Sequence, residues 1–503
     1  MSLGKTGHSF LKLGVVMFLA LGALQVSAQS TTVEEEVSQD TSVALPIQPI
    51  LDGHLGSEES DSPIVSPEDY LGQVIAFHPI ARQAALLNDM AEANLQGAKG
   101  AFDPKLSSGY ENKTLNGSEY FDYLETELKV TTLPGIDVIG SYNMTEGLYI
   151  NPERRTPDAG LIEAGAAVNL GQGLLIDKRR ADLRKARLMI TENELSRQLI
   201  LNDLWADALI AYWNWAESAA KVRIYLNAVD IAQARFEAVR QSYFNGNEPG
   251  IDTLEAWIRV EGRRIELANA EVKLQKSRNM ALAYLWEEDG MPTTSLNDHE
   301  PIPLSGVEFF DQLPEVGDEA LAAHPEIQRY QNKLDQAVID RRWKKEQLKP
   351  ELAVKWLYQS GVPGSDQYSP SIANQKVNFS FSFPLFLRKE RAGVEMANIK
   401  IEQLGLARDG KQRLLLAKAQ ALLAEEDILS TQILRQRQIV ADYQSLFAAE
   451  NTLFTLGESS LFKLQSRETN LIKARLELAA LLAQYPRVEV DLLRVLGQAY
   501  PGQ

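Results

Sequence analysis

The chain has 503 residues, of which 45% are hydrophobic, 24% charged and 8% aromatic, and its formal net charge is −17. This composition excludes wholesale disorder and a bundle of transmembrane helices, while the length allows a large core or several domains. The negative charge gives no reason to expect a nucleic-acid partner. Cysteine is absent, which excludes disulfides, thiolate nucleophiles and cysteine-based metal sites.

The first 28 residues are typical of a secretory signal peptide. Lys5 and Lys12 precede an apolar run from Leu13 to Leu24, and Val26-Ser27-Ala28 supplies a small-residue cleavage site. The run is too short to cross a bilayer as a helix. Residues 29–66 are acidic and rich in serine, and we expect this N-terminal segment to be disordered.

Two His-Pro pairs mark the start of two similar units. His78 and His324 lie 246 residues apart, and Pro104 and Pro350 repeat at the same offset. Later anchors repeat at an offset of 211, namely Arg180-Ala181 with Arg391-Ala392, Phe236 with Phe447, and Gly246 with Gly457. The chain is therefore predicted to be a tandem duplication, with 35 extra residues between Pro104 and Arg180 in the first copy.

Each unit is predicted to begin with a short helix, at residues 79–102 and 325–348, because proline is favoured at the first helical position. An apolar alternation with a period of two then predicts strands, at residues 162–168 in the first unit and at 352–358 and 377–383 in the second. The insertion adds two candidate strands, at 124–130 and 136–142. Such strands suit a transmembrane β-barrel, and equally any half-buried antiparallel sheet.

Very long helices are predicted after the strands. Residues 180–243 contain neither proline nor glycine, and 390–456 are interrupted only by three glycines, so each helix spans roughly 100 Å at 1.5 Å per residue. A glycine turn follows each one and leads into a second helix, at 251–286 and at 461–484. Ala and Leu at steps of three and four residues predict coiled-coil-like packing.

Three junctions resemble one known family. "FPLFLRKERAGVEMANIKI" (383–401) and "NLGQGLLIDKRRADLRKA" (169–186) are similar to its strand-to-helix junctions, and "LGESSLFKLQSRET" (456–469) to its tip turn. From about Ser66 onward the chain resembles the TolC-type outer-membrane efflux family. The resemblance implies an α+β membrane protein, with a trimeric transmembrane β-barrel continued by a long periplasmic α-helical coiled-coil barrel and built from two tandem repeats.

The resemblance also implies the domain order. We expect a first efflux repeat at residues 67–290, a linker at 291–320, a second repeat at 321–490 and a C-terminal tail at 491–503. Known members contribute four strands per protomer to a barrel of twelve. The 35-residue insertion either adds two strands per protomer or forms an extended hairpin outside the barrel. We favour the hairpin or a longer pair of existing strands.

The implied function is that of an outer-membrane channel in a Gram-negative bacterium, extending into the periplasm. It is the exit duct of a tripartite efflux or type I secretion system, working as a homotrimer with a periplasmic adaptor and an inner-membrane transporter, and contacting outer-membrane lipid. We expect no enzymatic activity, no catalytic residues, no metal and no cofactor. The alternative is a soluble periplasmic coiled-coil scaffold. A secreted hydrolase is disfavoured because the sequence offers no nucleophile–base–acid set.

Function is expected to concentrate at the two helix tips. The candidate adaptor contacts are Gly246, Asn247, Gly250 and Ile251 at the first tip, and Gly457, Glu458, Ser459, Ser460 and Leu461 at the second. In known members acidic residues after the second turn form a constricting ring, but those positions hold Lys463 and Ser466 here. Asp252 and Glu255 are the candidates to narrow the pore instead, although acidic residues are also favoured at any helix N-terminus.

Other polar and aromatic residues receive structural interpretations. His78 and His324 lie at helix starts without a second ligand nearby, so metal binding is not expected. Four aromatic residues in strands are candidates for the aromatic girdles of a membrane barrel, namely Tyr110, Tyr142, Trp356 and Tyr358.

Overall fold

The structure, a computed structural model, describes residues 63–246, 249–296, 299–306, 316–317, 321–368 and 371–498. These residues all belong to one contact unit that starts at Ile50. The predicted signal peptide, most of the acidic segment expected to be disordered, and parts of the predicted linker and tail lie outside the described residues.

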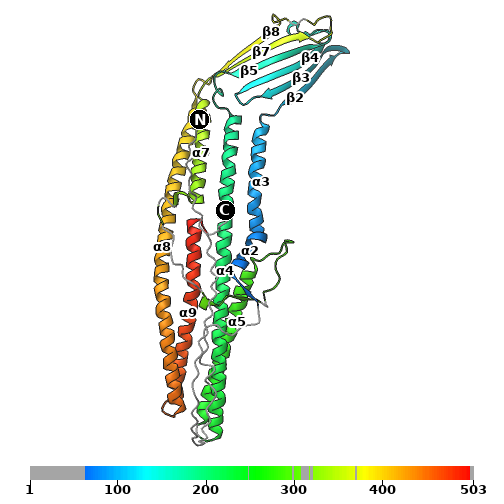
Figure 1. Cartoon of the computed structure of the whole chain (residues 1–503). Coiled ribbons are helices and arrows are strands. Elements are labelled where there is room, and N and C mark those ends of the chain that lie inside the picture. Colours follow the sequence, from blue (N-terminus) through cyan, green and yellow to red (C-terminus); the bar gives the residue numbers. More distant parts are fainter. Residues whose placement is uncertain are drawn as a thin grey trace, which may run out of the picture. The chain divides into compact units, whose positions relative to one another are not determined.

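Four helices run side by side beneath the sheet, two from each repeat (Figure 1). They are α3 (Pro79–Gly100), α4 (Lys178–Phe244), α7 (Pro325–Glu346) and α8 (Arg388–Thr455). Each packs on the next in the order α3, α4, α7, α8. The two repeats therefore meet where α4 of the first contacts α7 of the second.

Two returning helices complete a helical hairpin in each repeat. The helix α5 (Gly250–Leu282) packs along α4, and α9 (Leu461–Leu496) packs along α8, while α4 and α9 also contact each other. Toward the tips the neighbouring helices are thus α5, α4, α9 and α8 (Figure 1).

The helix α9 continues through Pro486 to Leu496, beyond the predicted end at Gln484. Proline normally interrupts a helix because it lacks an N–H group. Here the following turns bury Val488 and Leu492 in the core, and the Arg487 side chain donates to the carbonyl of Ala483 at 2.9 Å. Tertiary burial therefore outweighs the local cost of the proline.

The sequence analysis did not predict a short N-terminal helix, α2 (Pro67–Phe77), which is capped by Ser66. Just before it, within the segment expected to be disordered, β1 (Ile64–Val65) pairs in parallel with β6 (Glu300–Pro301). The Tyr70 hydroxyl donates to the Ala281 carbonyl at 2.8 Å, which attaches α2 to the end of α5. The short helix therefore forms part of the core with Tyr212 and Trp215 of α4.

Both His-Pro pairs are helix N-caps. The Nδ1 atom of His78 accepts from the backbone N–H of Ile80 at 3.2 Å, and that of His324 accepts from Glu326 at 3.1 Å. Both imidazoles are buried, and burial lowers the pKa of each below its usual range. The repeated histidines therefore satisfy orphan N–H groups at corresponding places in the two units.

A single antiparallel sheet caps the helices, with strand order β2-β3-β4-β5-β7-β8. Its strands are β2 (Lys105–Leu115), β3 (Ser118–Thr131), β4 (Ile136–Glu146), β5 (Leu161–Asn169), β7 (Glu351–Gly361) and β8 (Gln375–Ser382). The repeats join through β5 and β7. Asn116 and Gly117 both have positive φ, as a two-residue hairpin turn requires, and link β2 to β3.

The expectation that the insertion lengthens existing strands is wrong. Among the described residues the first repeat contributes four strands to this sheet and the second contributes two, so the insertion adds a strand pair to the same continuous sheet. The sequence places Tyr110 in a strand but gives β2 no bounds, because Ser108 and Asn112 interrupt its apolar alternation. The strand conformation of β2 is stabilised by pairing with β3 along eleven residues, although the sequence of β2 does not itself indicate the bounds of a strand.

The alternation of apolar and polar residues in β7 is interrupted at one position, and the packing of the sheet explains why. Leu357, on the otherwise polar face, is buried and pairs with Gly165 of β5. A Cβ atom on Gly165 would lie 1.9 Å from the carbonyl oxygen of Trp356. The glycine therefore permits the close approach of the two strands, and Leu357 and Ile139 occupy the adjacent space from either side.

Candidate functional site

The first tip is the connection between α4 and α5. Gly246 has a φ of 77°, a conformation that favours glycine, and α5 begins at Gly250. Of the predicted tip residues, Asn247 lies outside the described residues. Ile251 is exposed, as is Phe244 at the end of α4. The first tip thus presents apolar side chains to its surroundings.

The second tip is the connection between α8 and α9. Gly457 has a φ of 76°, and Ser460 caps α9 by accepting from the backbone N–H of Lys463 at 3.4 Å. The Ser459 hydroxyl donates to Glu450, and this hydrogen bond holds the pKa of the carboxyl below its usual range. Glu458 lies exposed in the turn.

Leu461 differs from the other predicted contacts because it is buried. It packs against Val239 of α4 and Ala256 of α5, which joins the second tip to the first hairpin. The next residue, Phe462, is 73% exposed, and it was missed by the sequence analysis. Its place in the sequence, as an aromatic residue in the first helical turn after the tip glycine Gly457, could have identified it as a candidate contact.

The four candidate constriction residues lie in the first turns of the returning helices. Asp252 is half-buried and Glu255 exposed on α5, while Lys463 and Ser466 are exposed on α9. Lys463 and Ser466 are three residues apart and so share one face of α9. The structure therefore leaves three of these four side chains free of the protomer's own core.

A buried charged cluster joins the two hairpins above the tips, and we call Arg235, Arg263 and Glu468 the interhairpin cluster. Glu468 of α9 is 2% exposed and forms an ion pair with Arg235 of α4. Arg263 of α5 lies 4.0 Å from the same carboxylate and donates to Thr469 at 3.1 Å. Because a buried carboxylate depends on its cationic partners, this contact couples the hairpins strongly.

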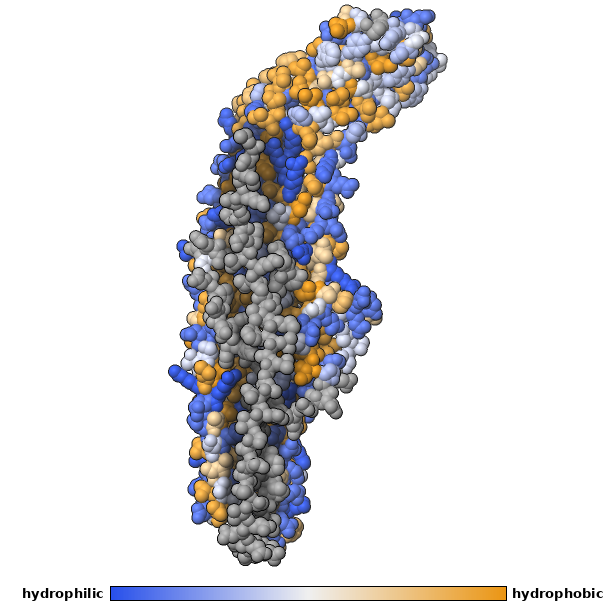
Figure 2. Space-filling view, viewed as in Figure 1, coloured by the Kyte–Doolittle hydropathy of each residue, from blue (hydrophilic) through white to orange (hydrophobic). Residues whose placement is uncertain are grey.

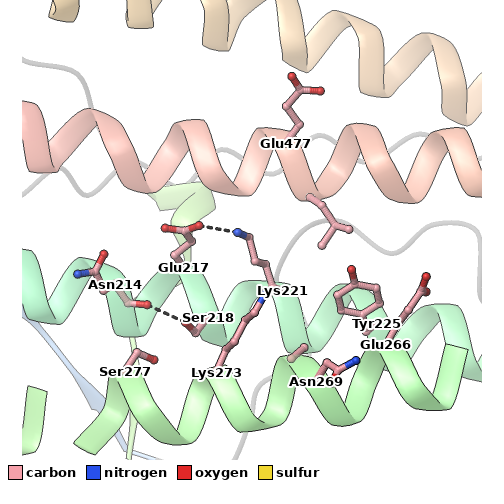
Figure 3. Close-up of a pocket in the computed structure, with 12 residues that line it drawn as sticks. Asn214, Glu217, Ser218, Lys221, Tyr225, Glu266, Asn269, Lys273, Ser277 and Glu477 are labelled. Carbon is pink, nitrogen blue, oxygen red and sulfur yellow. Dashed lines mark hydrogen bonds and ion pairs between the residues drawn. The ribbon is translucent and has the colours of Figure 1, made fainter. Parts of the chain in front are cut away.

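A polar cavity of about 610 Å³ lies among α4, α5 and α9 (Figure 3). Glu217 points toward Lys221 within it, at 2.5 Å, and also pairs with Arg487 at 2.8 Å. Glu266, at its other end, pairs with Arg263. Of these ion pairs, the one between Glu217 and Arg487 joins two helices, α4 and α9. Among the described residues no group of three His, Asp or Glu side chains could hold a metal ion.

The two faces of the sheet differ in chemistry in the rows nearer the helices, whereas farther out Asn112, Asp122 and Glu146 pair on the otherwise apolar face. One row of directly paired residues across five strands consists of Leu106, Leu128, Gly140, Ala164 and Tyr358. The adjacent row, one residue farther from the helices on each strand, consists of Ser107, Glu127, Ser141, Glu163 and Gln359. We call these the apolar face and the polar face. Tyr110, Tyr142, Trp356 and Tyr358 all lie on the apolar face.

Exposure is inverted relative to a water-soluble protein. On the apolar face Phe379 and Phe381 are 65% and 63% exposed, whereas Glu163 on the polar face is 5% exposed. Figure 2 shows hydrophobic side chains gathered over the sheet next to the helices. Soluble proteins bury such residues, while a membrane strand turns them toward lipid.

The polar face holds a network of hydrogen bonds and ion pairs. Glu163 accepts from Ser141 at 3.2 Å and from Gln359 at 2.6 Å, and lies 3.6 Å from Lys376. These partners come from β4, β7 and β8, so one carboxylate on β5 joins both repeats. None of the helices in the described part of the chain combines the length and the apolarity that a membrane crossing requires.

Comparison with known families gives one match that covers most of the chain. The sequence model described as outer membrane efflux protein matches residues 128–285 and 316–498, one segment for each repeat. Curated protein sequences gave no match.

Solved structures show the same fold at low sequence identity. The Campylobacter jejuni CmeC outer membrane channel superposes with a TM-score of 0.63 at 12% identity, covering 93% of this chain and 94% of that one. The open state of the Neisseria gonorrhoeae MtrE outer membrane channel superposes with a TM-score of 0.63 at 14% identity, covering 86% of this chain and 89% of that one. The Vibrio cholerae outer membrane protein VceC superposes with a TM-score of 0.61 at 14% identity, covering 86% of this chain and 96% of that one.

Proposed function

Because the chain belongs to the outer membrane efflux protein family, and is thus an outer-membrane channel for efflux, we propose that it is the exit duct of a tripartite efflux or type I secretion system. It conducts substrates passively from an inner-membrane transporter and a periplasmic adaptor to the exterior. The observation that carries the proposal is the inverted sheet, with exposed Phe379 and Phe381 on one face and buried Glu163 on the other. The fold matches the sequence-based prediction.

The arrangement of edges supports a homotrimer. One side of the protomer ends in β2, α3 and α5, and the other ends in β8 and α8. Exposed apolar side chains line both sides, namely Ile258, Ile265, Val272 and Met280 on α5 and Leu406, Leu414, Ile428 and Leu434 on α8. When one side of each protomer binds the other side of the next protomer, these head-to-tail contacts can close the protomers into a ring. The open sheet edges lead to the same conclusion, because an unpaired edge is not stable in lipid.

The tips are the proposed site of adaptor contact. Phe244, Ile251 and Phe462 are exposed at the end of the hairpins that lies farthest from the sheet. Apolar and aromatic anchors of this kind dominate the binding energy of most protein interfaces. The adaptor opens the duct by favouring an arrangement in which the hairpins separate, at the expense of the interhairpin cluster.

A soluble periplasmic scaffold is the main alternative, and a secreted enzyme is a weaker one. A scaffold has no need for a sheet face with exposed Phe379 and Phe381, which would favour aggregation in water. An enzyme would need a set of reactive groups, whereas Glu217 and Lys221 in the cavity of Figure 3 are held in ion pairs.

The test separates these functions by location and by conductance. The full-length protein is produced in a Gram-negative host, and the periplasm is released by osmotic shock before outer membranes are extracted with detergent. We expect the protein in the detergent extract, as a trimer that gives stepwise conductance in a planar bilayer. A protein released with the periplasm, or a membrane protein without conductance, would contradict the proposal.

A further inference from the structure

We infer that all six strands of each protomer enter the membrane, and that the trimer closes an eighteen-stranded barrel by pairing β8 of one protomer with β2 of the next. This inference rests on the proposed function, since it requires the trimer. It differs from the twelve-stranded barrel that the family resemblance implies, and it makes the inserted strand pair part of the channel wall.

The first observation is that, in the half of the sheet nearer the helices, the apolar face continues into the inserted region. Leu106 of β2 pairs with Leu128 of β3, and Val130 of β3 pairs with Val138 of β4. Leu106, Leu128 and Val138 are all well exposed, as are Phe379 and Phe381 in the second repeat. A ribbon outside the membrane would gain nothing from exposed apolar side chains in register with those of the membrane wall.

The second observation is that the polar face is concave as far as β3. The ammonium of Lys355 on β7 lies 3.6 Å from the carboxylate of Glu127 on β3, with β4 and β5 between the two strands. Three strand spacings amount to roughly 14 Å, so the two side chains meet only because the sheet curls toward its polar face. The inserted strand β3 and the second-repeat strand β7 therefore face the same lumen.

The third observation concerns the edges that remain free. A barrel built from β4, β5, β7 and β8 alone would need the outer edge of β4, but β3 occupies that edge along ten paired residues, from Thr131↔Asp137 to Asp122↔Glu146. Within the part of the chain that the structure describes, the free edges of this sheet are those of β2 and β8. Because neighbouring strands alternate in direction, β2 and β8 of adjacent protomers pair in the antiparallel sense, like every other pair in the sheet.

The helical part supports the extra strands at the turn between β3 and β4. Arg179, in the first turn of α4, donates to the Thr131 hydroxyl at 2.9 Å and lies 3.9 Å from Asp137. Lys129 pairs with the same carboxylate at 2.8 Å. These contacts tie the turn to the start of α4, so that six strands rest on the four helices of a protomer.

The consequence is a mouth wider than the duct below it. In the trimer eighteen strands stand above twelve helices, and barrel diameter grows about linearly with strand number. The barrel is then about one and a half times as wide as a twelve-stranded one, in the range of porins with an aqueous channel. The narrowest part of the path lies in the helices, and the charged polar face lines the exit.

Cysteine cross-linking tests the proposed closure, since the natural chain has no cysteine. Ser107→Cys on β2 is combined in turn with Asn378→Cys, Ser380→Cys and Ser382→Cys on β8, so that three registers between protomers are sampled. The matched control uses Ser141→Cys on β4 with the same three partners. All five positions lie on the polar face.

We expect at least one Ser107 pair to give a covalent trimer on oxidation of the detergent-purified protein, and no Ser141 pair to do so. Cross-linking of a Ser141 pair overturns the inference. A strand count by electron cryomicroscopy of the unmodified trimer checks the result: eighteen strands support the inference, and twelve overturn it even if the barrel conducts. A protein that stays monomeric overturns the proposed function and this inference together.

Discussion

Glu468 of α9 forms a buried ion pair with Arg235 of α4, although 233 residues separate them in the sequence. The pair joins the hairpins of the two repeats just above the tips. Each hairpin also has its own contacts, so this pair determines how firmly the two are held against each other rather than whether each one forms.

We therefore predict that Glu468→Ala destabilises the protein strongly. The change leaves Arg235 and Arg263 partly buried without their carboxylate, which typically costs about 3–5 kcal/mol. Glu477→Ala, at an exposed position of the same helix, should change the free energy of unfolding by less than about 0.5 kcal/mol. Denaturant unfolding of the detergent-purified variants measures both values. Equal effects would mean that the interhairpin cluster is not a stabilising contact.

A second prediction concerns the two faces of β8. Phe379→Arg places a charge on the apolar face, at a cost of about 2–4 kcal/mol if the position lies near the middle of the bilayer. Ser380→Arg places the same charge on the polar face, where a water-filled lumen accepts it. We expect Phe379→Arg to lower the yield of folded trimer in outer membranes and Ser380→Arg to leave it unchanged. The reverse order would place lipid on the polar face.

A third prediction concerns the histidine caps and pH. Burial lowers the pKa of His78 and His324 in the folded protein below the ordinary value of 6.5. As the pH falls below 6.5, the unfolded chain therefore binds protons first, and the free energy of unfolding decreases until the folded pKa is reached. Above pH 6.5 this contribution to stability is fully present.

The variants His78→Asn and His324→Asn separate capping from protonation. Asparagine is a good N-cap that does not titrate, so the double variant should keep its stability at pH 8 and lose much of the decrease between pH 8 and pH 5. Alanine at the same positions should cost about 0.5–2 kcal/mol per cap even at pH 8. Thermal unfolding across this pH range gives the comparison, and an unaltered slope in the asparagine variant would assign the pH dependence to other groups.

A fourth prediction tests adaptor contact at the tips. Phe462→Ala should weaken binding of the partner adaptor by roughly tenfold, equivalent to about 1.4 kcal/mol, if Phe462 is an interface anchor. Leu148→Ala, at a 79% exposed position between β4 and β5, serves as the control because it lies at the far end of the molecule. Affinity measured with the purified trimer and adaptor decides the point, provided that both variants keep the trimer intact. Equal affinities would move the contact away from Phe462.

The local periodicities of the sequence determined most of the helices and strands. The long helices follow from Ala and Leu at steps of three and four residues, and β5, β7 and β8 from an apolar alternation that only Leu357 of β7 interrupts. Where local signals conflict with packing, the prediction was incomplete. The predicted helix at 461–484 stops short of Pro486, yet burial of Val488 and Leu492 carries α9 past it.

By itself the sequence determined the duplication, the order of the long helices and of most strands, and the membership in an efflux-channel family, because these depend on repeated anchors and short-range patterns. Only the tertiary structure decided that β3 occupies the edge of β4, that Lys355 meets Glu127 and that Arg235 meets Glu468. Such contacts join residues far apart in the chain. They depend on how the sheet curls and how the helices cross, which no local pattern specifies.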